Sequence, residues 1–194
     1  MTIILENICK SYGDLQVLDN YNLTVEWGRA YCLTGPEGCG KTTILKVFMG
    51  LEKPDSGQIH RMGDYKYPTL QSAYVSQADA NLVMKKNAIW NVKKVHRWAS
   101  KGRAIEELSK FIPVERQTIP VSELTPVERR FVEIVRALFV PADFIVLDEP
   151  FEGMNEAERE KAKAYILEIR GTRPLLMATR KPEGVDFAKI INLE

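Results

Sequence analysis

The sequence lacks the features that mark membrane-spanning, secreted and strongly nucleic-acid-binding proteins. No apolar run approaches the roughly 18 residues that a membrane-spanning helix needs. The 27 Lys and Arg residues are balanced by 26 Asp and Glu, and a net charge of +1 gives no basic field for nucleic acid. Residues 1–6 are too short and too acidic for a secretory signal. The 3 cysteines are odd in number and not spaced for a metal site, which favours reduced thiols in a cytoplasmic protein.

One glycine-rich segment carries the clearest chemical signal in the 194 residues. It has the form G-x-x-x-x-G-K-[ST], the Walker A phosphate loop, and consists of Gly35, Pro36, Glu37, Gly38, Cys39, Gly40, Lys41 and Thr42. Residues 30–34 before it predict a buried strand, and residues 43–49 after it predict an amphipathic helix that ends near Gly50. Glycines let successive N–H groups point inward at phosphate oxygens, and the helix N-terminus adds its positive dipole end. We therefore expect a nucleotide site that extends to Thr43, with Lys41 at the β- and γ-phosphates and the Thr42 hydroxyl on Mg²⁺.

A second segment ends in two carboxylates. Residues 144–149 form a continuous apolar run that closes with Asp148 and Glu149, the Walker B pattern of a buried parallel strand. Ligands of such sheets sit beyond the carboxyl ends of the strands. Asp148 is therefore expected to hold Mg²⁺, through water, and Glu149 to act as the general base that orients and polarises the attacking water.

The rest of the chain predicts an α/β fold: a P-loop NTPase core with an antiparallel β subdomain and an inserted α-helical lobe. Short strands are expected at 2–8, 16–18, 21–25 and 72–76, with a hairpin over 58–67. A helical pattern covers 81–139, including a helix that Pro126 can start at its first turn. A helix over 156–169 and strands over 174–179 and 190–193 follow. The whole of 1–194 is expected to form one domain, with the core at 1–77 and 140–194 and the lobe at 78–139.

Tyr12 and two tryptophans leave alternatives open at this stage. Tyr12 can offer its ring as a stacking platform for a nucleotide base or can be an ordinary sheet-surface tyrosine. Trp90 and Trp98, among basic residues that include Lys93 and Lys94, either belong to a docking groove or fill the core of the lobe.

The order of these features resembles the ATPase subunits of ABC (ATP-binding cassette) transporters over nearly the whole chain. The resemblance rests on Tyr12, the Walker A segment, Gln77, the helical lobe and the run Leu147-Asp148-Glu149-Pro150. It implies ATP and Mg²⁺ as cofactors, Tyr12 stacked on adenine, and Gln77 in contact with Mg²⁺ and the lytic water. It also implies membrane permease subunits, a second ABC ATPase subunit in a head-to-tail dimer, no nucleic acid, and a cytoplasmic location on the inner face of the cell membrane.

Three positions depart from the family pattern. The L-S-G-G-Q signature falls on residues 124–128, which read L-T-P-V-E, and Pro126 has no N–H to offer a phosphate. Arg180 replaces the switch histidine; it cannot accept a hydrogen bond, although it can contact phosphate as a cation. Asn155 stands where the D-loop usually has aspartate. The expected catalytic residues are Glu149, Gln77 and Arg180. Because of the three departures, we expect ATP binding to survive better than hydrolysis. The alternative is that the departures are sequence drift without functional consequence.

Two functions therefore stay open from the sequence. The chain is expected to be the ATP-binding subunit of an ABC transporter, coupling ATP binding and slow hydrolysis to a permease. The alternative is a hydrolysis-poor module that forms the passive half of a heterodimeric ATPase. A DNA- or ribosome-acting relative is disfavoured, because one near-neutral domain has no nucleic-acid module and no room for long coiled coils.

Overall fold

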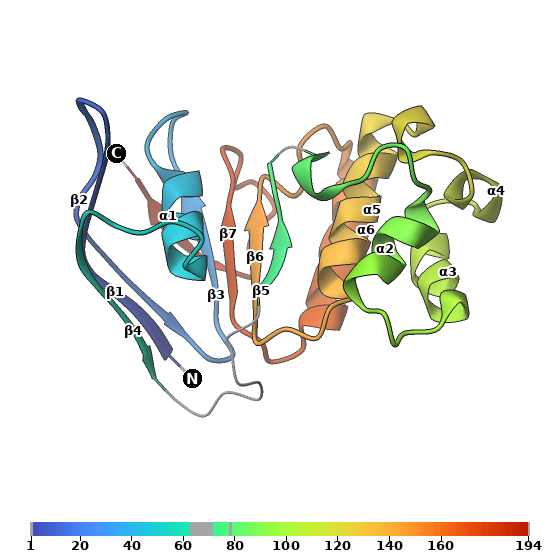
Figure 1. Ribbon diagram of the computed structural model, residues 1–194. Coiled ribbons are helices and arrows are strands. Elements are labelled where there is room, and N and C mark those ends of the chain that lie inside the picture. Colours follow the sequence, from blue (N-terminus) through green and yellow to red (C-terminus); the bar gives the residue numbers. More distant parts are fainter. Residues whose placement is uncertain (1, 63–71, 78, 194) are drawn as a thin grey trace. The chain divides into compact units, whose positions relative to one another are not determined.

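The computed structural model describes residues 2–62, 72–77 and 79–193, which divide into two compact units (Figure 1). The first unit contains the described residues up to Ser72 together with 143–149 and 172–193. The second contains the described residues of 73–142 and 150–171. The domain boundaries expected from the sequence stay a prediction.

An antiparallel sheet forms the N-terminal part of the first unit. Its strand order is β2-β1-β4, made of β1 (Thr2–Tyr12), β2 (Leu15–Glu26) and β4 (Ser56–Met62). Ile3, Leu5 and Ile8 of β1 are fully buried, as expected for a sheet with one face against the core. The division of β2 into two strands was wrong, because β2 runs on through Asn20. Asn20 takes a φ of 46°, and the pairing of β1 with β2 shifts register beside it, so a bulge absorbs the polar residues.

Parallel strands form the second layer of the first unit. They are β3 (Ala30–Thr34), β6 (Phe144–Asp148), β7 (Leu175–Ala178) and β8 (Lys189–Asn192), in the order β6-β7-β3-β8. Every residue of β3, β6 and β7 is buried, which explains their continuous apolar sequence. Helix α1 (Lys41–Met49) packs on this sheet through Phe48, whose ring meets that of Phe144 edge-on at 5.1 Å. The carboxyl ends of β3 and β6 therefore lie at one edge of one sheet, as the two Walker segments require.

The second unit is mainly helical. It contains all of β5 (Ser72–Val75) except Ser72, and short 3-10 turns at η1 (Asp79–Asn81) and η2 (Val121–Glu123). Its helices are α2 (Ala88–Val95), α3 (Lys101–Ser109), α4 (Val114–Gln117), α5 (Pro126–Leu138) and α6 (Glu156–Arg170). Helix α5 begins at Pro126, as the sequence predicted. The ring of Phe111 stacks on Phe131 of α5 at 4.5 Å and meets Tyr165 of α6 edge-on at 5.0 Å, which ties the helices together.

The two tryptophans of the second unit lie at its surface. Trp98 is 95% exposed and Trp90 is 39% exposed, so neither fills the lobe's core, and of the two alternatives left open by the sequence that one was wrong. Among the residues that the structure describes, none of the helices combines the length and apolar character needed to cross a bilayer. The expected second strand of the 58–67 hairpin lies outside the described residues.

Candidate functional site

The phosphate loop connects the end of β3 to the start of α1. Gly38 and Gly40 take φ values of 83° and 91°, in the left-handed region that glycine favours. A Cβ on Gly40 would lie 3.0 Å from side-chain atoms of Val17 and Leu18, which would have to shift by a few tenths of an ångström to make room. Gly40 caps α1 without any side-chain hydrogen bond. The helix N-terminus is therefore covered by no capping side chain and faces the loop with its positive dipole end.

Lys41 lies within this loop and not on its outer surface. Its Nζ donates hydrogen bonds of 2.7 Å to the main-chain oxygens of Gly35 and Pro36 and lies 3.5 Å from Cys39 Sγ. The residue is only 8% exposed. Two carbonyls of the loop itself thus hold the ammonium group inside the loop.

Thr42 and Asp148 bring the two Walker segments together. The Thr42 hydroxyl donates to Asp148 Oδ2 at 2.7 Å, and Asp148 is 1% exposed. A hydroxyl and a carboxylate side by side suit Mg²⁺, which takes few protein oxygens and keeps waters and substrate phosphates as its other ligands. In the described part of the chain, no three or more His, Cys, Asp or Glu side chains gather into a metal cage.

Glu149, directly after β6, is held by the end of the neighbouring strand β7. Its φ of 46° is unusual for a residue with a Cβ. Oε2 accepts the Thr179 hydroxyl at 3.0 Å, and Oε1 accepts the Arg180 N–H at 2.9 Å. Arg180 Nε lies 3.5 Å from the same Oε1, and Nη1 lies 3.6 Å from Glu37 of the phosphate loop. The carboxylate is therefore fixed in place and bridged by a guanidinium to the loop.

Thr179 is the site residue that the sequence interpretation missed. It follows the buried strand β7, which pairs with β6 in parallel, and Asp148 is opposite Ala178. Because the carboxyl ends of parallel neighbours meet at one edge, a polar residue just after β7 belongs beside Glu149. The signal was present, but it depended on knowing that these two strands are neighbours.

Tyr12 ends β1 and presents its ring beside the helix of the phosphate loop. It is 45% exposed, and its hydroxyl interacts with the side chains of Thr43 and Glu52. Desolvation, followed by the hydrogen bond with Glu52, raises the pKa of Tyr12 above its usual value. Lys10 Nζ lies 5.5 Å from the ring centroid. An exposed ring next to the loop fits a base platform, and the stacking of Tyr12 on a base stays a prediction.

Gln77 and the signature segment belong to the second unit. Gln77 follows β5, is exposed, and has its main-chain oxygen bonded by Arg130 of α5. At the signature position, Thr125 and Glu128 form a reciprocal capping box, in which Thr125 N–H donates to Glu128 Oε2 at 2.7 Å and Glu128 N–H donates to Thr125 Oγ1 at 3.2 Å. Pro126 contributes no N–H, so most donors of this helix start are absent or already bonded.

Asn155 has a local structural role. It is the N-cap of α6, and it forms a second capping box with Glu158 through two 2.9 Å hydrogen bonds. Asparagine and aspartate are both favoured N-caps, so the replacement leaves this function intact.

The comparisons with known proteins agree with this geometry. A family model described as ABC transporter matches residues 18–152. The probable sulfate/thiosulfate import ATP-binding protein CysA of Chlorella vulgaris is 33% identical over 180 residues, covering 87% of this chain and 75% of that protein. The Fe(3+) ions import ATP-binding protein FbpC 1 of Rhizobium meliloti is 31% identical over 183 residues, covering 87% of this chain and 50% of that protein.

The fold matches solved cassettes as well. A bacterial ABC transporter cassette solved as a dimer, MJ0796, superposes with a TM-score of 0.85 at 23% identity, over 98% of this chain and 94% of that one. The chain spans about half the length of most of the curated relatives that it matches. Because the family model covers most of the chain and the sequence relatives agree with it, the chain belongs to the ABC transporter family, as an ATP-binding cassette with the P-loop NTPase fold of these ATPases.

Proposed function

We propose that the chain is the ATP-binding subunit of an ABC importer and couples ATP binding and slow hydrolysis to a membrane permease. The observation that carries the proposal is the 2.7 Å hydrogen bond between Thr42 and Asp148, beside Lys41 inside the loop. Import is supported by relatives whose names describe import ATP-binding proteins. The location follows from the partner: a permease would hold the chain on the inner face of the cell membrane.

The roles of the site residues follow from their chemistry. Residues 35–43 would hold the phosphates of ATP, with Lys41 as the cation, and the ring of Tyr12 would stack on adenine. Thr42, Asp148 and Gln77 would hold Mg²⁺, which supplies charge neutralisation to the phosphate oxygens when bound. Glu149 would orient the attacking water and accept its proton at a carboxylate oxygen.

Slow hydrolysis is the part of the proposal that this chain's own residues favour. Arg180 contacts Glu149 from one side and Glu37 from the other. A guanidinium can neutralise phosphate charge but cannot accept a hydrogen bond from the water, so it replaces a histidine only in part. The carboxylate must then position water while it keeps three polar contacts from residues 179 and 180.

A second candidate, the passive half of a heterodimeric ATPase, is favoured by the capping box at the start of α5. In a homodimer, both ATPs would meet this helix start, where Thr125 N–H is already bonded and Pro126 has none. A partner subunit with an intact signature would supply free donors to the ATP held by this chain. Turnover measured against subunit composition would separate the two candidates.

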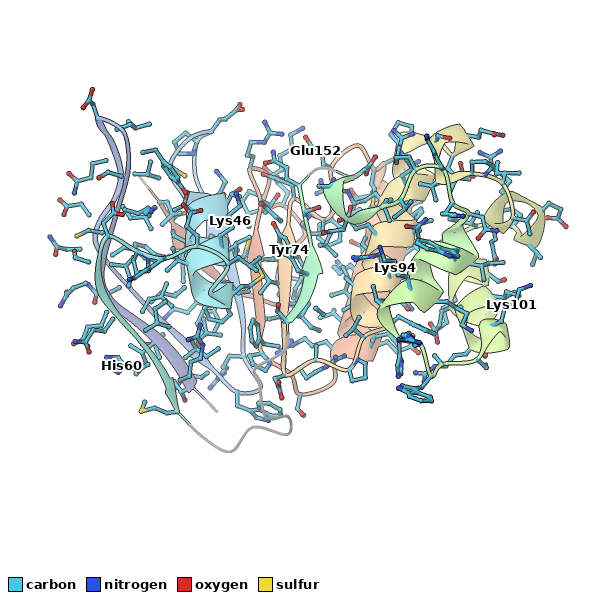
Figure 2. The ribbon with its side chains drawn as sticks, in the orientation of Figure 1. Lys46, His60, Tyr74, Lys94, Lys101 and Glu152 are labelled. Atoms are coloured by element: carbon cyan, nitrogen blue, oxygen red, sulfur yellow. The ribbon has the colours of Figure 1, made fainter. Side chains whose placement is uncertain are left out.

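The permease partner has a suitable surface on the second unit. A groove of about 620 Å³ is lined by Trp90 and by the cations Lys93, Lys94, Arg97 and Lys101, of which Lys94 and Lys101 are labelled in Figure 2. Lys94 Nζ lies 5.3 Å from the centroid of the Trp90 ring. A groove lined by an aromatic ring and four cations suits a short, acidic segment of a membrane subunit.

Replacing Lys41 with alanine tests the nucleotide site. Each charge-assisted hydrogen bond to phosphate is worth roughly 1.5–3 kcal/mol, so affinity for Mg-ATP should fall by about 10- to 100-fold. The matched control is Lys46→Ala, a half-buried lysine in the last turn of the same helix. Binding is followed with a fluorescent ATP analogue, and thermal unfolding checks the fold. Unchanged affinity in a folded Lys41→Ala variant would overturn the site assignment.

A further inference from the structure

Helix α5 buries a pair of opposite charges that the proposed chemistry does not use. Arg130 is 6% exposed and Glu133 is 0% exposed, and they lie one helical turn apart with Arg130 Nη1 at 3.5 Å from Glu133 Oε2. A buried ion pair is costly to desolvate unless further hydrogen bonds complete both groups. The bonds that complete this pair therefore show what the pair holds.

Those bonds all go to the segment that contains Gln77. Glu133 Oε1 accepts the Ser76 N–H at 3.2 Å, the Ser76 hydroxyl at 2.7 Å and the Asn81 side-chain amide at 3.0 Å. Arg130 donates through Nη1 to the main-chain oxygen of Ser76 and through Nη2 to the main-chain oxygen of Gln77. The main chain on both sides of Gln77 is thus bonded to one helix.

The neighbouring residue of α5 adds a third attachment. Arg129 Nε donates to Asp79 Oδ2 at 2.7 Å and Arg129 Nη1 donates to the Leu124 oxygen at 2.9 Å. Asp79 opens the 3-10 turn that follows Gln77, and Leu124 precedes α5. Arg129 therefore joins the start of α5 to the downstream side of the same segment.

We propose that Arg130 and Glu133 are positioning residues, which lock the main chain of Gln77 to α5 so that a displacement of the helix start moves Gln77. Pro126 lies four residues before Arg130, about 6 Å along the helix axis at 1.5 Å per residue. A helix transmits such a displacement as a rigid element, because a continuous ladder of backbone hydrogen bonds connects each turn to the next. The side chain of Gln77 stays exposed and keeps its freedom to reach a ligand. The inference rests on the proposed function, since it assigns the lock to the glutamine of that site.

Three variants separate the hydrogen bonds from the charge. Glu133→Gln keeps an oxygen for Ser76 and Asn81, whereas Glu133→Ala removes the acceptor altogether. Arg130→Lys keeps the positive charge but loses the fork that reaches two carbonyls at once. The matched control is Gln117→Ala, which removes a fully buried side chain of the same unit that donates to Ser109 and Ile112 instead.

The first measurement is amide hydrogen exchange of the full chain over residues 76–81. Glu133→Ala is expected to speed exchange of the Ser76 amide about tenfold, Arg130→Lys about threefold, and Glu133→Gln less than threefold. Gln117→Ala should lower the unfolding temperature without changing the amide exchange rates in residues 76–81. If the Ser76 amide exchanges at the same rate in Glu133→Ala as in the parent, the proposal is overturned. If Glu133→Ala does not fold, the exchange rate in Arg130→Lys decides the proposal.

The second measurement is steady-state turnover beside the dissociation constant for ATP. Glu133→Ala should lower kcat about tenfold while the dissociation constant changes less than twofold, because Gln77 is misplaced but the phosphate loop is untouched. A loss of kcat no larger than that of Gln117→Ala would contradict the positioning role. A parent chain that does not bind ATP would contradict the proposed function instead, and the exchange measurement would still decide whether the lock exists.

Discussion

Replacing Glu128 with glutamine should destabilise the helical unit in a manner that depends on pH. The Glu128 carboxylate accepts hydrogen bonds from Thr125 N–H at 2.7 Å and from Arg116 Nη2 at 2.6 Å, and Arg116 Nε donates to its other oxygen. The hydrogen bonds with Arg116, and then those with Thr125, lower the pKa of Glu128 to about 2. The charged form is therefore the form that the folded chain prefers.

The size of the effect follows from that pKa. An unfolded glutamate titrates near pH 4.3, and each pKa unit corresponds to about 1.4 kcal/mol, which sets a ceiling of about 3 kcal/mol. The Arg116 side chain is 39% exposed, and solvent screening at such a pair reduces the expected loss to about 1–2 kcal/mol. Because the folded pKa is the lower one, this stabilisation is full above about pH 4.3 and is lost as the pH falls through about 2.

The assay is urea unfolding of parent and variant at several pH values, with Glu106→Gln on the exposed side of α3 as the control. The two unfolding free energies should differ by about 1–2 kcal/mol near neutral pH and converge as the pH approaches about 2. The control should follow the parent throughout. A difference that stays constant down to the lowest pH would show that packing, and not the charge of Glu128, stabilises the start of α5.

Three further variants address the proposed chemistry and the permease. Glu149→Gln should abolish hydrolysis and keep ATP bound, and turnover equal to the parent's would place the base elsewhere. Arg180→Ala should lower turnover about tenfold, because Glu149 loses an anchor and the phosphates lose a cation; an unchanged rate would remove Arg180 from the catalytic set. The double variant Lys93→Glu and Lys94→Glu should weaken co-purification with the permease by reversing charge in the groove, while affinity for ATP is retained; normal assembly would contradict the docking surface.

Much of the fold could be predicted because its strongest signals are local. The strand at 30–34 is predicted by a short apolar run before a glycine turn, and the structure gives it the same bounds. Helix α5 starts where Pro126 at the first turn allows it to start. The error at β2 had the opposite origin, since Asp19 and Asn20 interrupt the apolar pattern but are absorbed as a bulge once β1 pairs across them.

In the candidate site, too, the contiguous residues could be predicted and the contacts between distant residues could not. Residues 35–43 form a contiguous motif, so their spacing alone predicts a phosphate-binding loop. The contacts of Thr179 with Glu149, and of Glu133 with Ser76, join residues far apart in the chain. A glutamate within an amphipathic helix is expected to face solvent, and only its pairing with Arg130 and its hydrogen bonds from Ser76 and Asn81 explain why Glu133 is inside.

The hydrogen bonds of Lys41 within its own loop affect the free energy of nucleotide binding. The ammonium group already has two carbonyl partners at 2.7 Å, so a phosphate would compete for a cation that is satisfied by its own loop. The Thr42 hydroxyl is likewise already bonded, to Asp148, so Mg²⁺ would compete with that hydrogen bond. Binding is then an exchange of partners at a preordered site, with little chain ordering to oppose it. We therefore expect an anion with several oxygens to bind better than one with few, because it can replace more of the bonds that it displaces.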